Sequence, residues 1–232
     1  MNYFIDNYSE NKFEIAGDDF LHLKAQRKRV GDILTIVPIK GNHYLMGSIV
    51  EITKRSAVLK KVNEIIKPRL LSPEITLYQA IAKKQKMDII LQKATELGVN
   101  TIIPIITKNI VPQAEKSNIE RWARIVREAA MQSRRFDIPA IETPKRLKSI
   151  EWLKPVCCLA EKGAETKFRT FVESNKAPQK IGIIIGAEGG FDDDELELLK
   201  QKGVVLASFG SNILRTETAA ITAMGVLRWF YE

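Results

Sequence analysis

Two short glycine-bearing loops, each lying between an apolar run and a helical pattern, constrain the fold of this 232-residue chain most strongly. The first loop, residues 186–191, follows the apolar run 181–185, and the second, residues 210–215, follows the run 204–209. Short apolar runs rich in β-branched side chains are typical of buried strands in parallel sheets. Because the carboxyl ends of neighbouring parallel strands meet at one edge of the sheet, the two loops predict a ligand-binding crevice there.

The same alternation of strand and helix extends over residues 73–232. It predicts an α/β domain in which a mainly parallel sheet is covered by helices on both faces. The expected strands are 75–82, 101–106, 156–160, 180–185 and 204–209. The expected helices are 86–97, with Gly98 as its left-handed cap, 118–133, a helix after Asp192, and 216–231.

The first part of the chain has a different pattern. Short β-rich runs at 33–37, 44–52 and 57–62 are separated by turn residues, which predicts a small mostly β domain at 1–70, a barrel or a sandwich. Two prolines, Pro68 and Pro73, bracket a segment without periodicity, and we place the domain boundary there.

Composition narrows the class of protein. The 36 Lys and Arg outnumber the 28 Asp and Glu, giving a net charge of +8, which is compatible with a polyanionic partner and equally with an ordinary solvated surface. No apolar run reaches the roughly 18 residues of a membrane helix, so we expect a cytoplasmic protein with no membrane partner and no signal peptide. Cys157 and Cys158 lie inside an expected buried strand and should be reduced.

Several chemistries are excluded by the residue types available. The two histidines, His22 and His43, both precede the boundary and have no ligand array at suitable spacing, so we expect no metal site and no histidine-based triad in the second domain. Asp192, with Glu195 three residues later, predicts a helix-capping box, and acidic groups at that helix start would repel a phosphate. A general base in the crevice must then be a carboxylate, an activated lysine or the substrate's own ionisation, which favours chemistry carried by a cofactor.

Four motifs in order resemble those of one known family. The stretches 185–191 (IGAEGGF) and 213–219 (ILRTETA) resemble the signature loops of the ribosomal RNA small subunit methyltransferase E family, within the SPOUT superfamily of trefoil-knotted methyltransferases. Residues 92–99 (QKATELGV) and 121–135 fit the same family, and the segment from His22 to Asp32 resembles its N-terminal PUA-like barrel. The resemblance covers essentially the whole chain.

That resemblance carries a set of expectations. It implies S-adenosyl-L-methionine-dependent methylation of ring nitrogen 3 of one specific uridine in 16S rRNA, with the rRNA or the small ribosomal subunit as partner. It implies a PUA-like, RNA-binding β-barrel at 1–70 and a SPOUT domain at 73–232 that binds the cofactor and forms a homodimer. The deep trefoil knot of that domain rests on the resemblance alone, since knotted connections are strongly disfavoured in general.

The chain departs from the family pattern at three positions. Ala187 stands where the family usually has proline, Asn212 where it often has a basic residue, and Tyr3 where an arginine is expected. These departures bear on the rigidity of the cofactor loop and on RNA contacts.

Three residues are the candidates for catalysis. Arg215 should stabilise the negative charge that develops on the uracil once its imide proton leaves, and Glu188 or Glu217 could take that proton. The alternative for Arg215 is an ordinary salt bridge to one of these two carboxylates. The expected cofactor-binding residues are Leu159, Gly186, Glu188, Gly189, Gly190, Phe209, Gly210, Ile213, Leu214, Arg215 and Thr218.

Basic residues in two stretches are the candidates for RNA binding. They are Lys24, Arg27 and Arg29, and then Gln132, Arg134 and Arg135. No aromatic residues are interleaved with them, so contact with the RNA backbone is favoured over base stacking. For Arg134 and Arg135, stabilisation of a helix C-terminus is a competing explanation. Two other functions stay open: an RNA-binding assembly factor without catalysis, and a SPOUT enzyme that methylates ribose in tRNA or rRNA.

Overall fold

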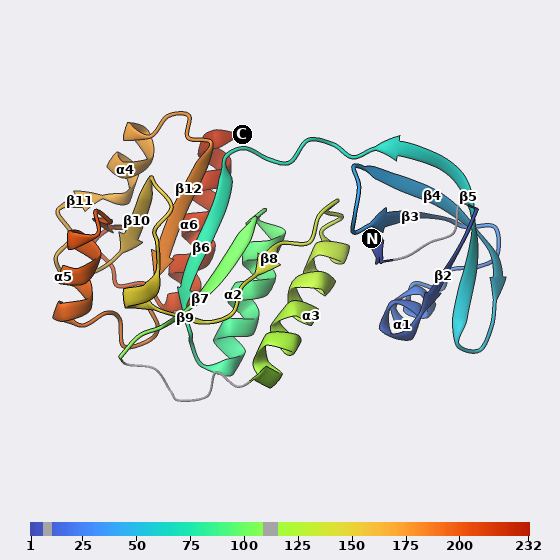
Figure 1. Cartoon of the computed structure of the whole chain (residues 1–232), viewed down its shortest axis with the longest axis horizontal. Helices are drawn as coiled ribbons and strands as arrows, with labels where there is room; N and C mark the ends of the chain where they lie inside the picture. Colours follow the sequence, from blue (N-terminus) through green and yellow to red (C-terminus); the bar gives the residue numbers. More distant parts are fainter. Residues whose placement is uncertain (7–10, 109–115) are drawn as a thin grey trace. The chain divides into compact units, whose positions relative to one another are not determined.

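The computed structural model describes residues 1–6, 11–108 and 116–232, and the chain divides into two compact units (Figure 1). The first unit comprises Met1–Arg69 together with Ala130–Ile138, and the second comprises Leu70–Ala129 together with Pro139–Glu232. Residues 7–10 and 109–115, which belong to the expected ranges 1–70 and 73–232, lie outside the described part. Within that part, no helix combines the length and the apolar character that crossing a membrane requires.

The first unit is a curled five-stranded sheet with one helix. Its strands are β1 (Asn2–Ile5), β2 (Lys12–Ala16), β3 (Ile33–Pro38), β4 (His43–Ile52) and β5 (Ser56–Ile66), arranged in the order β1-β3-β4-β5-β2. Among the described strands of this unit, β1 and β3 pair in parallel and the other pairs are antiparallel. Two register shifts between β4 and β5 bend these strands, as bulges do. Gly47 lies at one shift, where an added Cβ would come within 2.7 Å of the Phe13 ring.

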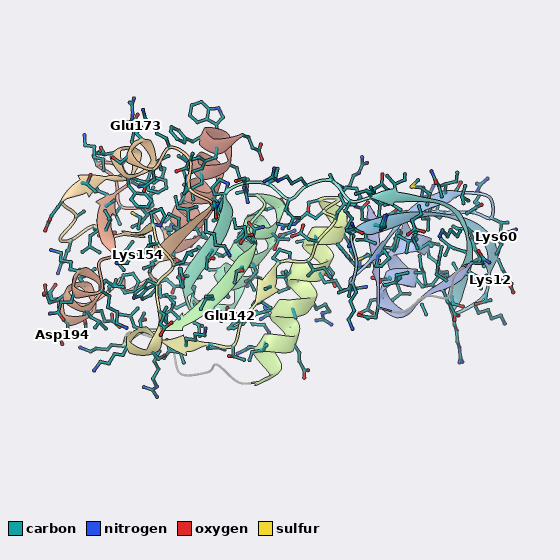
Figure 2. All side chains as sticks on the ribbon, turned by 45° about the horizontal axis from the view of Figure 1, so that its top comes forward. Lys12, Lys60, Glu142, Lys154, Glu173 and Asp194 are labelled. Carbon is teal, nitrogen blue, oxygen red and sulfur yellow. The ribbon has the colours of Figure 1, made fainter. Side chains whose placement is uncertain are left out.

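Alternation along β2 shows why this sheet has one buried face. Phe13 and Ile15 are buried while Lys12 and Glu14 are exposed, so successive side chains point to opposite faces. Lys12 and its register partner Lys60 project outward (Figure 2). Strands β1 and β2 and the helix α1 (Gly17–Ala25) were not anticipated from sequence, because each is short.

The core of the first unit includes residues from a distant part of the chain. Ala130 and Met131 are fully buried within it, and the ring of Phe136 contacts that of Tyr44 at 4.7 Å between centroids. Burial of these apolar side chains accounts for the assignment of 130–138 to this unit, whereas the sequence placed them with residues 73–232.

The second unit is built on the parallel sheet that the sequence predicted. Every strand pairing in it is parallel, and the order is β11-β13-β10-β12-β6-β7-β8, with β9 also paired to β7. The strands are β6 (Glu74–Ala80), β7 (Thr101–Ile106), β8 (Ala140–Ile141), β9 (Lys145–Arg146), β10 (Val156–Leu159), β11 (Thr166–Lys167), β12 (Lys180–Ile185) and β13 (Val205–Ser208). The helices are α2 (Lys84–Glu96), α3 (Lys116–Gln132), α4 (Phe168–Ser174), α5 (Asp193–Gln201) and α6 (Thr216–Tyr231), with a 3-10 turn at Leu147–Ser149.

Several expected boundaries agree with the structure and a few differ. The strands 101–106 and 180–185 and the helix 216–231 have the expected limits, and Gly98 caps α2 with φ of +80°. The strand expected at 75–82 ends at Ala80. The helix expected at 118–133 ends at Gln132, because Arg134 adopts a left-handed φ of 59° and the backbone turns away.

Candidate functional site

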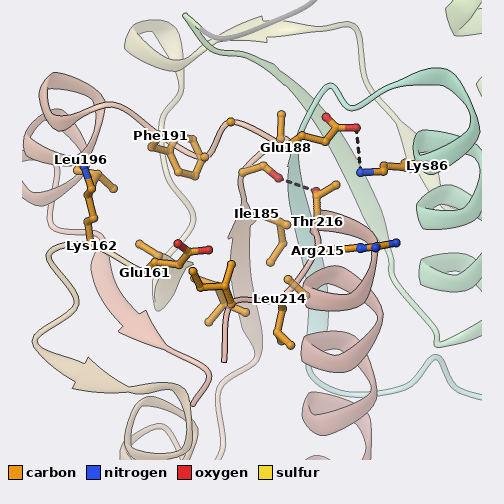
Figure 3. A pocket seen from close by; sticks show the side chains of 18 residues that line it. Lys86, Glu161, Lys162, Ile185, Glu188, Phe191, Leu196, Leu214, Arg215 and Thr216 are labelled. Atoms are coloured by element: carbon orange, nitrogen blue, oxygen red, sulfur yellow. Dashed lines mark hydrogen bonds and ion pairs between the residues drawn. The ribbon is translucent and has the colours of Figure 1, made fainter. Parts of the chain in front are cut away.

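A crevice lies at the carboxyl ends of three neighbouring strands, β10, β12 and β13. It holds a cavity of about 460 Å³ lined by the loops that follow these strands and by the start of α6 (Figure 3). A second cavity of about 330 Å³ shares Leu159, Ile213 and Leu214 with the first, so the two adjoin in one hollow. The paired loops therefore meet where the sequence placed them.

Most of the expected cofactor-binding residues line this hollow. Those in the first cavity are Leu159, Gly186, Glu188, Gly189, Gly190, Ile213, Leu214 and Arg215. Phe209 and Gly210 line the second cavity. Thr218 lines neither and is exposed on α6. Its neighbour Thr216, two residues earlier and therefore about 200° away around the helix, faces the cavity instead.

The glycine loop after β12 forms a tight turn. The Gly190 N–H donates to the Ala187 carbonyl at 3.0 Å, and Gly190 has a left-handed φ of 65°. A Cβ added to Gly186 would lie 3.3 Å from the Gly190 Cα and from the Phe191 ring. The close contacts at 186 and the left-handed φ at 190 explain why glycine is favoured at both positions.

A buried polar relay fixes this loop to the rest of the sheet. The Thr216 hydroxyl donates to the Gly186 carbonyl at 2.6 Å, and the Gln79 side-chain N–H donates to Thr216 Oγ1 at 3.1 Å. Gln79 is fully buried in β6 and Thr216 is 5% exposed. Sequence reasoning missed both residues, although a glutamine inside the apolar run 75–82 was a signal that could have identified one of them.

Two carboxylates at the edge of the cavity share one lysine. The Lys86 ammonium lies 3.4 Å from Glu188 Oε1 (Figure 3). It also lies 3.7 Å from Glu217 Oε2, and the Lys83 N–H donates to Glu188 Oε1 at 3.2 Å. Burial alone raises the pKa of the Glu188 carboxyl, but hydrogen bonds from its own N–H and from the Lys83 N–H, together with Lys86, outweigh burial and lower that pKa. Glu188 is therefore ionised at neutral pH. Lys86 was not among the residues singled out from sequence.

Arg215 differs from these carboxylates in having no ion-pair partner among the described residues. It occupies the N-cap position of α6, is exposed, and lines the cavity. The salt bridge to Glu188 or Glu217 that the sequence left open does not form, since both carboxylates pair with Lys86. The guanidinium is thus available to a ligand.

The acidic residues after Phe191 have the structural role expected of them. Asp192 Oδ1 accepts from the Glu195 N–H at 2.8 Å, and Glu195 Oε2 accepts from the Asp192 N–H at 3.1 Å, which confirms the capping box. The Lys108 ammonium contacts Asp192 and Asp194 at 2.8 and 2.7 Å. These contacts anchor the end of the glycine loop.

Metal and thiol chemistry find no support in the described part of the chain. No group of three His, Cys, Asp or Glu side chains there could hold a metal ion. Cys157 and Cys158 are free and fully buried, and burial raises the pKa of Cys157 to about 12, so no thiolate forms near neutral pH.

All six RNA-binding candidates fall in the first unit, although more than 100 residues separate their two stretches. The Asn2 side chain links them: it donates to the carbonyls of Arg134 and Arg135 at 2.9 Å each, while Gln26, next to Arg27, contacts Met1. The candidates that are exposed are Lys24, Arg27, Arg29, Gln132 and Arg134.

The backbone and ion pairs distinguish these basic residues from one another. Arg27 and Arg134 both adopt the left-handed conformation, with φ of 55° and 59°, which is uncommon for residues with a side chain. Arg135 pairs with Asp137 at 2.6 Å and its side chain is only 11% exposed, so it has a structural partner. Arg134 and Arg135 lie beyond the end of α3, which weakens the explanation that they complement its dipole.

Comparisons with known proteins agree with this architecture. A family model described as an RNA methyltransferase domain matches residues 70–228. Ribosomal RNA small subunit methyltransferase E of Rickettsia conorii is 36% identical over 97% of this chain and 93% of its own length, and that of Buchnera aphidicola from Acyrthosiphon pisum is 32% identical over 99% and 92%.

Solved structures share the fold over almost the full length. A Legionella pneumophila protein in complex with the bound cofactor SAM superimposes with a TM-score of 0.88 at 28% identity, covering 98% of this chain and 96% of that one. With identity and coverage of this extent over both units, the chain belongs to the ribosomal RNA small subunit methyltransferase E family.

Proposed function

We propose that this protein uses S-adenosyl-L-methionine to methylate ring nitrogen 3 of one uridine in 16S rRNA. The observation that carries the proposal is the crevice itself, which is lined by a glycine loop and by an arginine without an ion-pair partner among the described residues. Membership of the small subunit methyltransferase E family supports rRNA as the substrate, and the cofactor bound in the Legionella protein supports the choice of methyl donor.

The residues that line the crevice suit this cofactor. A cavity of about 460 Å³ lies in the range of small-molecule sites, which combine apolar walls with a few polar groups. Gly186 and Gly190 let backbone groups approach a ligand closely, and Ile213 and Leu214 supply apolar surface. When bound, the cofactor supplies a methyl group activated by a sulfonium centre.

The side chains of the protein would then prepare the uracil. Ring nitrogen 3 is a poor nucleophile until its proton leaves, and the negative charge that results spreads over the base. The Arg215 guanidinium is placed to stabilise that charge, and holding the nitrogen in line with the methyl group provides much of the remaining acceleration.

Two carboxylates are candidates for accepting the imide proton. Glu188 has a lowered pKa and is therefore a weaker base. Glu217 Oε2 is buried and receives no hydrogen bond among the described residues; the Lys86 ammonium lies 3.7 Å from it, whereas Glu188 Oε1 also accepts the Lys83 N–H. We infer that Glu217 is the better candidate of the two.

The first unit is proposed to bind the RNA backbone as a PUA-like barrel. Its support is the gathering of five exposed candidate residues in one compact unit, in a chain with net charge +8. From membership of the ribosomal RNA small subunit methyltransferase E family we also infer a trefoil knot in the second unit, a homodimer and a cytoplasmic location.

Mass spectrometry of the methylated nucleoside tests the reaction. Purified protein is incubated with unmodified 16S rRNA and isotopically labelled cofactor, and the RNA is digested to nucleosides. Label in 3-methyluridine is the expected result. Label in a ribose-methylated nucleoside would identify a different RNA methyltransferase, and cofactor binding in calorimetry without any transfer would exclude the proposed catalysis under these conditions.

Charge reversal tests the RNA-binding unit. Arg27→Glu combined with Arg29→Glu should weaken 16S rRNA binding and reduce the slope of log affinity against log salt by roughly one for each phosphate that is no longer neutralised. Lys54→Glu combined with Arg55→Glu, in the exposed turn between β4 and β5, is the matched control. Equal slopes for the two double variants would contradict the assignment.

A further inference from the structure

Lys86 joins three segments that are far apart in the sequence. It lies in the first turn of α2 and lines the crevice, and its ammonium reaches Glu188 of the glycine loop (Figure 3). The same ammonium reaches Glu217 of α6. Among the described residues it is the only cation within ion-pair distance of either carboxylate. A single side chain therefore compensates two negative charges at the edge of the crevice.

These carboxylates need a cation because neither is well solvated. The Glu188 side chain is 27% exposed and that of Glu217 is 19% exposed, and Glu217 Oε2 receives no hydrogen bond among the described residues. A half-buried carboxylate without a partner either becomes protonated or recruits another positive group. Removal of Lys86 would leave Glu188 with its backbone hydrogen bonds alone and Glu217 Oε2 with no cation near it among the described residues.

Arg215 is the positive group that we expect to pair with these carboxylates when Lys86 is removed. It lies two residues before Glu217, in the same crevice as Glu188, and has no ion-pair partner among the described residues. An arginine held by a carboxylate in a bidentate pair would be neutralised and turned away from a ligand.

We propose that Lys86 is a positioning residue that keeps Arg215 available to the substrate base by occupying the two carboxylates that compete for it. The inference rests on the proposed function, in which Arg215 stabilises charge on the base. Lys86 itself needs no contact with the substrate. Its loss should therefore lower the rate of methyl transfer far more than the affinity for the cofactor.

The experiment compares Lys86→Met with Lys84→Met. Both variants remove one positive charge from the first turn of α2, but Lys84 is exposed and does not line the crevice. We expect the single-turnover rate of Lys86→Met to fall by on the order of 10-fold to 100-fold, with cofactor affinity in calorimetry changed by less than about threefold. Lys84→Met should retain the wild-type rate, and Lys86→Arg should recover most of the rate that Lys86→Met loses.

A crystal structure of ligand-free Lys86→Met supplies a readout that does not depend on activity. We expect the Arg215 guanidinium within ion-pair distance of Glu188 or Glu217. An Arg215 that stays unpaired, a carboxylate taken instead by Lys83, or a wild-type rate for Lys86→Met would each overturn the inference. If Lys86→Met does not fold, Lys86→Gln, which keeps a polar head group, carries the same test.

These outcomes separate the inference from the function on which it rests. Wild-type protein that neither binds the cofactor nor methylates rRNA would defeat the proposed function. If the wild-type protein methylates rRNA, Arg215→Ala loses this activity and Lys86→Met keeps it, only the role of Lys86 would be contradicted.

Discussion

The two loops that line the crevice are held in opposite ways. The glycine loop after β12 is fixed at both ends and in the middle, by Thr216 at Gly186, by Lys83 and Lys86 at Glu188, and by the capping box at Asp192. In the loop after β13, residues 210–214 form no hydrogen bond within the described chain. Ile213 in that loop is 75% exposed.

This contrast indicates how a ligand would be bound. The glycine loop is already arranged, so binding there costs little conformational entropy. The second loop has apolar surface and Arg215 at its end, and has no hydrogen bonds of its own among the described residues to hold it. Substitutions in the first loop should therefore affect stability and affinity together, whereas substitutions in the second should affect function alone.

Arg215 gives the largest expected effect and the sharpest test of this contrast. Arg215→Ala should fold normally while the single-turnover methylation rate falls by on the order of 100-fold or more, the scale of losing one charge-stabilising donor. The control is Arg169→Ala, which removes an exposed arginine of α4 that pairs with Glu173. Activity within a few-fold of wild type in Arg215→Ala would remove this residue from the mechanism.

Thr216 tests the fixed loop. Thr216→Val keeps the shape but removes the donor to the Gly186 carbonyl and one of the two acceptors of the Gln79 amide, which keeps its bond to the Ala80 carbonyl, so unfolding free energy should fall by about 1–3 kcal/mol. Cofactor affinity should fall by roughly tenfold because the loop loses its anchor. Thr216→Ser keeps the hydroxyl and should restore both. Denaturant unfolding and calorimetry measure the two effects, and a loss of stability without any loss of affinity would break the link between them.

Ile213 gives the smallest effect and tests the exposed loop. Ile213→Ser should leave the thermal midpoint unchanged, because the side chain is already exposed to water. Cofactor affinity should fall by a few-fold, since serine offers the ligand much less apolar surface. Leu21→Ser, at an exposed leucine of α1, is the control for general solubility effects. If Ile213→Ser binds as wild type does, the second loop closes on the ligand without this residue.

The elements around the site could be predicted because their local signals are strong. The apolar runs that form β7 and β12 and the capping box of α5 depend on residues close together in the sequence. By contrast, β1, β2 and α1 are too short for a pattern to distinguish them, and they pack against strands found later in the chain. Residues 130–138 could not be assigned to the first unit for the same reason, since the sequence does not indicate which core buries an apolar residue such as Ala130 or Met131.

The sequence by itself determined the parallel sheet, the two loops and the candidate residues on them, because strand period, glycine and capping signals act over a few residues. Only the tertiary structure decided which polar and charged side chains pair with one another. Gln79 meets Thr216 across 137 positions, and Lys86 reaches Glu188 and Glu217 across more than 100. Such pairings are set by the order of strands in the sheet, which no local pattern encodes. For that reason the sequence identified Arg215, while the structure identified Lys86, which pairs with the two carboxylates near it.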